Sequence, residues 1–229
     1  MQTREADRQK RGEKRSEARR KRGSGDAATR QRLLDAGLQL FADKGFAGVT
    51  IRDLCRAADA NVASVNYHFG DKLGLYREVM ERALEGARED VTISAPEGAD
   101  PEDRIRHYVH TLMPRLASPS EDVLSVQKLM RHEMNDPTPL AQWIADEVIM
   151  PRIRFLNEAV AELLDADPDD PRVRRCVVSV QAQCLFYQPN NFRKVAMPGW
   201  REMTAAEIAA AADHIVAFTL AGIERIANA

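Results

Sequence analysis

Long apolar runs are missing from this chain of 229 residues. No stretch of 18 or more consecutive apolar residues occurs, and the polar, basic N-terminus lacks the apolar segment of a secretory signal. We therefore expect a cytoplasmic protein with no membrane partner. The hydrophobic content of 44% is nevertheless sufficient for a buried core.

Cysteine is scarce as well. The three residues Cys55, Cys176 and Cys184 form no C-x-x-C motif, and their odd number does not suit a disulfide framework or a zinc site. We expect all three to be buried as small hydrophobic side chains in a reducing compartment.

Catalytic signatures and strand patterns are also missing. The chain has no nucleophile elbow, no triad-like spacing and no paired carboxylates, so we expect neither an enzyme nor a cofactor. No segment alternates between polar and apolar residues as a strand does. Long amphipathic segments take their place, and they predict an all-α fold.

Charge is unevenly distributed along the chain. Residues 1–25 contain ten Lys or Arg and four acids, a net charge of +6, whereas the whole chain carries −2. This tail has too few apolar residues to order itself, and we expect it to be disordered. It is either a solvated extension or an arm that neutralises DNA phosphates.

The segment after this tail has the sequence pattern of a helix-turn-helix. A first amphipathic helix, residues 27–44, is followed by Gly45 as its stop signal. Thr50, with Asp53 three residues later, has the capping-box pattern of a short second helix, and Asn61 suits the N-cap of a third. Two short helices are therefore joined by a tight turn.

The outward side of the third helix has the character of a DNA-reading surface. With Val65 and Phe69 turned inward, the exposed side chains are small, polar or aromatic and include no acid, so they can enter a major groove. They are Val62, Ala63, Ser64, Asn66, Tyr67 and His68. Asp71 then caps a longer helix, residues 72–90, in whose first turn we expect Lys72 to bind phosphate.

A stretch rich in Pro and Gly, residues 94–101, predicts a domain boundary. The chain thus divides into a basic tail (1–25), a helix-turn-helix domain (26–90) and a helical ligand-binding and dimerisation domain (100–229). In the last domain the predicted helices span residues 101–117, 120–135, 139–165 with a kink at Pro151, 170–188 and 204–228.

These motifs resemble the DNA-binding domain of the TetR family of bacterial repressors. The resemblance rests on Leu33-Leu34-Asp35-Ala36, Phe41-Ala42-Asp43-Lys44-Gly45-Phe46, Val49-Thr50 and Val65-Asn66-Tyr67-His68-Phe69-Gly70-Asp71-Lys72, which occur in the family's order. The family's turn glycine is Asp59 here, so we expect the turn to form without a residue that adopts positive φ freely. An aromatic residue common in the family is replaced by Asn66, whose amide can pair with adenine.

The resemblance also implies functional residues. It implies phosphate contacts for Thr50, Ser64, His68 and Lys72, and contacts to base edges or nearby backbone for Val62, Ala63, Asn66 and Tyr67. The segment 183–187 and the final helix, with Ile215, Phe218 and Gly222, are similar to the CecR-like branch, in which the last two helices form the dimer interface. We therefore expect a homodimer on palindromic, double-stranded operator DNA.

Two further sites can be considered in the larger domain. His107 and His110, even with His132 and Glu133 on the next helix, lack a matched further ligand, so we expect no metal site. Aromatic and Met side chains at helical spacing instead suggest a pocket for a small apolar effector, although such residues also form ordinary cores. The residues expected to border that pocket are Tyr108, Met130, Trp143 and Gln183.

Three classes of function remain after these exclusions. The first is a ligand-responsive repressor, which the resemblance connects with neighbouring transport or resistance genes. The second is a non-sensing architectural DNA-binding protein, and the third is a helical enzyme or carrier. The salt dependence and sequence preference of DNA binding separate the first two.

Overall fold

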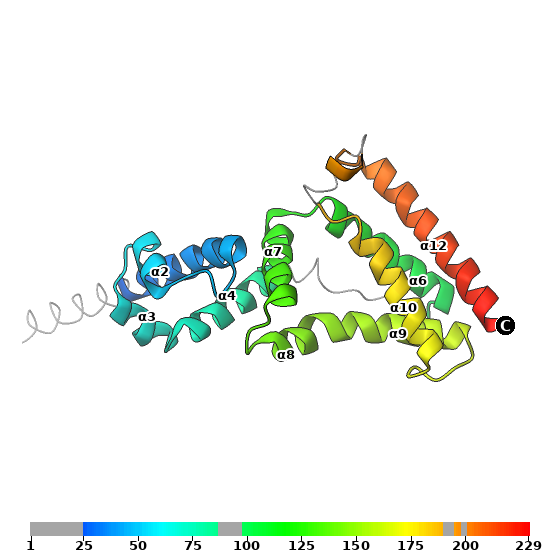
Figure 1. The fold of residues 1–229 in the computed structure, drawn as a ribbon, viewed down its shortest axis with the longest axis horizontal. Coiled ribbons are helices and arrows are strands. Elements are labelled where there is room, and N and C mark those ends of the chain that lie inside the picture. The colour runs from blue at the N-terminus through cyan, green and yellow to red at the C-terminus, as the bar shows by residue number, and fades with distance from the viewer. Residues whose placement is uncertain (1–24, 87–97, 190–194, 198–200) are drawn as a thin grey trace, which may run out of the picture. The chain divides into compact units, whose positions relative to one another are not determined.

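The computed structural model describes residues 25–86, 98–189, 195–197 and 201–229 (Figure 1). These residues are helical or lie in turns and connections, and none of them forms a strand, which confirms the all-α class. The predicted disordered tail lies outside the described residues except for Gly25. The first half of the predicted linker, residues 94–97, lies outside them too.

Contacts within the chain define two compact units. The first contains the chain up to Ala83 together with Ser125–Thr138, and the second contains Leu84–Leu124 together with Pro139–Ala229. The segment Ser125–Thr138 therefore packs with the helix-turn-helix rather than with the larger domain to which the sequence assigned it. The packing of this segment could not be predicted from local sequence patterns, because the contacts that hold it join residues more than 50 positions apart.

The first unit is built on a helix that spans residues 25–44. This helix ends at Gly45, whose φ of +70° places it in the left-handed region and whose N–H donates to the Phe41 carbonyl over 2.9 Å. Three helices follow, α2 (Ile51–Ala57), α3 (Val62–Phe69) and α4 (Lys72–Gly86). Their shared core is formed by side chains that are almost fully buried, including Leu33, Phe41, Leu54, Val65, Leu75 and Tyr76.

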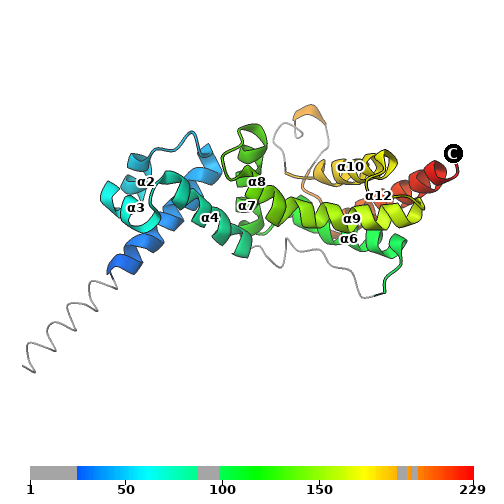
Figure 2. The same ribbon diagram turned by 90° about the horizontal axis from the view of Figure 1, so that it is seen from below.

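The second unit is a helical bundle. Its main helices are α6 (Pro101–Ala117), α9 (Met150–Leu163), α10 (Pro171–Leu185) and α12 (Ala205–Ala227). Helix α6 packs against α9, and α12 packs against α6 and α10 (Figures 1 and 2). One continuous apolar core fills the space between these helices. A further helix, α7 (Glu121–Asn135), begins in the second unit and continues into the first.

The helix predicted over residues 139–165 is interrupted near Pro151. The structure has α8 (Ala141–Ile144), then a π-helical turn η1 (Ala145–Ile149), and then α9, which begins at Met150. Pro151 has no N–H and its ring crowds the carbonyl four residues earlier, so a regular α-helix cannot run through it undisturbed. The widened turn just before Pro151 accommodates both effects.

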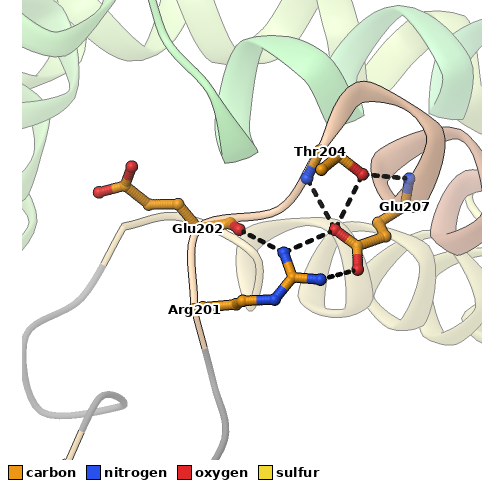
Figure 3. Close-up of polar contacts among 4 residues, drawn as sticks. All are labelled: Arg201, Glu202, Thr204 and Glu207. Atoms are coloured by element: carbon orange, nitrogen blue, oxygen red, sulfur yellow. Dashed lines mark hydrogen bonds and ion pairs between the residues drawn. The ribbon is translucent and has the colours of Figure 1, made fainter.

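The last helix begins at a network of polar contacts (Figure 3). The Glu207 carboxylate accepts from the Thr204 N–H at 2.8 Å, and the Glu207 N–H donates to the Thr204 hydroxyl at 3.3 Å, which together form a capping box. Both guanidinium nitrogens of Arg201 also donate to this carboxylate, at 2.5 and 3.1 Å. The start of α12 is therefore held by several charge-assisted hydrogen bonds.

Candidate nucleic-acid interface

The short helix α2 is bounded by the predicted capping box. The Thr50 hydroxyl accepts from the Asp53 N–H at 3.2 Å, and the Asp53 carboxylate accepts from the Thr50 N–H at 3.1 Å. The Thr50 hydroxyl also donates to this carboxylate at 2.6 Å, and this bond, followed by the one from the Thr50 N–H, holds the pKa of the Asp53 carboxyl below its ordinary value. Leu54 and Cys55 are buried on the inner side of the helix. The start and inner face of α2 thus agree with the sequence prediction.

The turn after α2 contains a residue with positive φ that is not a glycine. Asp59 itself adopts a φ of +46°, so the turn contains a left-handed residue although the family's glycine is absent. Asp is one of the few residues other than Gly that tolerate this conformation. The Arg32 guanidinium, from the first helix, donates to the carbonyls of Ala58 (2.8 Å) and Asp59 (3.4 Å). The first helix therefore holds the turn that joins α2 to α3.

Helix α3 is oriented by a cap at one end and two buried side chains on one side. The Asn61 side chain accepts from the Ser64 N–H at 2.8 Å, as the sequence predicted. Val65 and Phe69 face the core and are 0% and 8% exposed. Because these two residues are fixed inward, the rest of the helix must face away from the core.

The outward face of α3 contains the predicted DNA-contacting side chains. Tyr67 is 75% exposed and Val62 is 47% exposed, which leaves both free to meet a partner. Ala63 and Asn66 are also exposed, whereas Ser64 and His68 are half-buried. The helix has no acidic residue, so this face does not repel phosphate.

Lys72, at the start of α4, is held by the protein itself. Its ammonium donates to the carbonyls of Phe46 (2.9 Å) and Val49 (3.0 Å) and lies 4.0 Å from the centre of the Phe46 ring. Burial lowers the pKa of this amine. Two of its three N–H donors are therefore used in joining α4 to the segment before α2, and one is left for a phosphate.

A buried polar contact lies behind the helix-turn-helix. The Tyr76 hydroxyl of α4 donates to the Glu133 carboxylate of α7 at 2.7 Å, and the other oxygen of that carboxylate accepts from the Thr138 N–H at 3.0 Å. Burial, and then the bond to Glu133, raise the pKa of Tyr76 well above its ordinary value. From the sequence, Glu133 was considered only as a candidate metal ligand. The pairing could not be found from spacing, because its partner lies 57 positions away.

Further contacts attach α7 to the first helix. Lys128 forms an ion pair of 3.1 Å with Asp43. A Cβ added to Gly45 would lie 2.8 Å from the His132 ring, so the glycine permits close approach of α7. Since His132 packs here while His110 pairs with Asp213 at 3.0 Å, the two do not converge on one site. No cluster of three potential metal ligands occurs in the described part of the chain.

The predicted effector residues do not share one environment. Tyr108 is 1% exposed in the core of the second unit, where its ring stacks on Phe155 at 6.3 Å. Trp143 is half-buried on α8. Gln183 instead lies on a surface groove of α10, and its amide donates to the Ser179 carbonyl at 3.3 Å. Met130 belongs to the first unit.

The groove that contains Gln183 runs between α10 and α12. It has a volume of about 290 Å³ and is mostly apolar, with Phe218, Gly222 and Ile226 along α12. Phe218 is 65% exposed, and Val178 on α10 is 58% exposed. By length and composition α12 is also apolar enough to cross a membrane, but a third of its most apolar stretch is buried inside this unit. An uncovered apolar strip therefore follows α10 and α12.

A second groove lies between α6 and the start of α12. It is bordered by His110 and Pro114 on α6 and by small side chains of α12, among them Ala209 and Ala212. Neither of these two grooves is bordered by Tyr108 or Trp143. Of the four residues predicted to border the pocket, Gln183 lines one of these grooves, and the pocket itself stays a prediction.

Comparison with known proteins gives matches to both units. Residues 33–79 match the model described as bacterial regulatory proteins of the tetR family, and residues 101–223 match the model of the C-terminal domain of the HTH-type transcriptional dual regulator CecR. CecR of Shigella flexneri is 26% identical over 77% of this chain and 82% of its own length. YttP of Bacillus subtilis is 34% identical over 59 residues, only 28% of its length.

A solved structure has the same fold. The crystal structure of AibR in complex with isovaleryl coenzyme A and operator DNA superposes with a TM-score of 0.58. It covers 83% of this chain and 97% of AibR at 20% identity, and at that identity the likeness concerns the fold alone.

Proposed function

This chain belongs to the TetR family of bacterial regulators, in the branch with the CecR-type C-terminal domain, and from this premise we propose that it is a repressor released from operator DNA by a small molecule. The observation that carries the proposal is the outward face of α3, which is exposed, free of acids and supported from behind by capped, buried elements. Such a face suits a major groove. Its site of action is then the cytoplasm, on genes such as neighbouring transport or resistance genes.

The active form is a homodimer. The apolar strip on α10 and α12 supports this assignment, because exposed apolar side chains such as Val178 and Phe218 are stabilised when a protein partner covers them. A second copy that presents the same strip would cover both residues symmetrically. Two recognition helices would then read an inverted repeat with half-sites about one helical turn apart, or a small multiple of it.

The effector binds in the second unit and acts through α7. Both α7 and α4 have residues in each of the two units, and the later part of α7 holds Tyr76 of α4 through Glu133. A ligand that moves the start of α7 would therefore disturb the packing of α4. By linkage, operator DNA must weaken the binding of the ligand by the same factor by which the ligand weakens the binding of operator DNA. This factor is about 5- to 150-fold for a typical coupling. The effector is a small, largely apolar molecule.

One observation favours a second candidate, an architectural DNA-binding protein. The net charge of +6 in residues 1–25 can supply affinity for any duplex. In that case deletion of the tail would abolish binding altogether. For the repressor, the same deletion weakens binding at low salt and leaves the preferred sequence unchanged.

The test is selection of duplexes from a random library by the full-length protein at physiological salt, with Tyr67→Ala as the comparison. The proposed repressor enriches one inverted repeat, and Tyr67→Ala binds it more weakly. Enrichment of no shared sequence would contradict the proposal and support the architectural alternative. Compounds that stabilise the protein against heat are then tested for operator release, and a stabilising compound that leaves operator affinity unaltered would refute ligand control.

A further inference from the structure

The reading face of α3 lacks the side chains that read guanine. Guanine is recognised most often by Arg or Lys, which donate to its O6 and N7 atoms. Helix α3 contains neither residue along its eight positions. The next cation in the chain, Lys72, directs its ammonium to the Phe46 and Val49 carbonyls. A guanine reader is therefore missing from the helix itself.

The side chains that α3 does expose match the other base pair. Asn66 is exposed, and within the described part of the chain none of the hydrogen bonds engages its amide. That amide can accept from N6 and donate to N7 of one adenine at the same time. Val62 is 47% exposed and Ala63 next to it is exposed as well, so the first turn of α3 presents methyl groups. Methyl groups pack on the C5 methyl group of thymine.

Two other polar groups of α3, Ser64 and His68, are less available for base reading. The Ser64 hydroxyl is already bonded to the Asn61 side chain at 3.0 Å. The His68 ring lies between Tyr67 and Phe69, with ring centres 4.9 and 5.9 Å away. Neither group presents two hydrogen-bond donors side by side, as Arg does for the O6 and N7 atoms of guanine.

We infer that α3 reads A·T base pairs: the Asn66 amide pairs with an adenine, and Val62 packs on a thymine methyl group in the same half-site. This inference rests on the proposed function, since it requires α3 to enter the major groove of an operator. It goes further by naming the bases. Any G·C preference in the operator would then come from elements other than α3.

The thymine contact can be tested by removing one methyl group from the DNA. Each thymine of the selected operator half-site is replaced in turn by deoxyuridine, which differs only by the C5 methyl, and the affinity of the full-length protein is measured. We expect about a three- to fivefold loss at one or two positions, the effect of one buried methyl group. The Val62→Ala protein should lose most of this dependence. Val195→Ala, at another exposed valine, should retain it.

The adenine contact can be tested in the same way at one nitrogen. Replacement of each adenine by 7-deazaadenine removes the N7 acceptor and preserves Watson–Crick pairing. We expect one position at which wild type loses about tenfold in affinity, while Asn66→Ala binds both duplexes equally. Both variants change exposed side chains, so the fold is preserved, and melting temperatures check this.

The outcomes separate the inference from the proposed function. If selection enriches no sequence, the proposed function fails and this inference fails with it. If an inverted repeat is enriched but no thymine is sensitive to deoxyuridine, or Val62→Ala keeps the full sensitivity, A·T reading by α3 is overturned while the repressor stands. The inference would also be overturned if replacement of one guanine weakens binding by wild type but not by Asn66→Ala, because Asn66 would then contact that guanine.

Discussion

Two exposed helical faces of this protein have opposite chemistry. The face of α3 carries an amide, a phenol and small side chains, and every element around it is fixed by polar contacts such as the Thr50–Asp53 capping box. The strip on α10 and α12 is apolar, with Phe218 65% exposed beside a hollow at Gly222. The first suits a hydrated polyanion, and the second suits a copy of the same surface. The following predictions test whether these two faces have separate roles.

The largest effect should come from charge on α12. Ile215 is 2% exposed, so Ile215→Glu should leave little folded protein, because it buries a charge in the core. Phe218→Glu should instead leave the fold intact and weaken the dimer by at least about 100-fold, since a central aromatic contact is replaced by a charge. Sedimentation and circular dichroism separate the two results.

The control for this pair is Val195→Glu, which puts the same charge at an exposed valine. It should leave the mass and the fold unchanged. A wild type that sediments as a monomer at micromolar concentration would contradict the dimer assignment. Unfolding of Phe218→Glu would show that this side chain belongs to the core.

The next largest effect should come from the polar contact behind α3. Glu133→Ala leaves the buried Tyr76 hydroxyl without its partner, and we expect a loss of about 2–3 kcal/mol in the free energy of unfolding. Gln183→Leu should change it by less than about 0.5 kcal/mol, because this amide lies at the surface. Chemical denaturation measures both. A loss for Glu133→Ala as small as the change for Gln183→Leu would mean that the Tyr76–Glu133 bond is dispensable for stability.

A smaller effect concerns the start of α12. Thr204→Ala removes the N-cap and should lower the free energy of unfolding by about 1 kcal/mol, as measured by chemical denaturation.

The stability contributed by Glu207 should depend on pH. The bonds from Thr204 and then from Arg201 hold the pKa of Glu207 below its ordinary value of 4.5. A depressed folded-state pKa stabilises the protein above the unfolded value and loses this contribution as the pH falls through the folded-state pKa. The difference in melting temperature between wild type and Glu207→Gln should therefore shrink from pH 7 to pH 3, and a constant difference would contradict this cause.

The smallest effect should come from the turn between α2 and α3. Asp59 has a positive φ, so Asp59→Gly should relieve strain and raise the free energy of unfolding by about 0.5–1 kcal/mol, whereas Asp59→Ala should lower it. DNA affinity should be nearly unchanged by the glycine variant. Destabilisation by glycine would show that the Asp59 side chain contributes more than its backbone strain costs.

Local signals in the sequence were sufficient for the first face. Thr50 and Asn61 bind the backbone only three residues ahead, so caps, helix starts and the inward direction of Val65 and Phe69 follow from short spacing. The same holds for Thr204 at the start of α12. The positive φ of Asp59 could not be predicted from the sequence, because Asp adopts this conformation less readily than Gly.

Long-range contacts were beyond such reasoning. Tyr76 and Glu133 meet across 57 positions, and neither residue has a neighbour in sequence that indicates the other. The direction of Gln183 also depends on packing, since α10 has one side in the core and one side on the surface groove. For this reason the sequence could not place the effector site, whereas the fold class and the exposed face of α3 could be predicted.

The central claim is that the outward face of α3 selects the DNA to which this protein binds. The most direct measurement is a genome-wide map of bound sites in the native host, made with wild type and with Asn66→Ala at equal protein levels. The account predicts wild-type sites that share one inverted repeat, and loss or redistribution of those sites in Asn66→Ala. Sites without a shared sequence, or an identical set for both proteins, would contradict it.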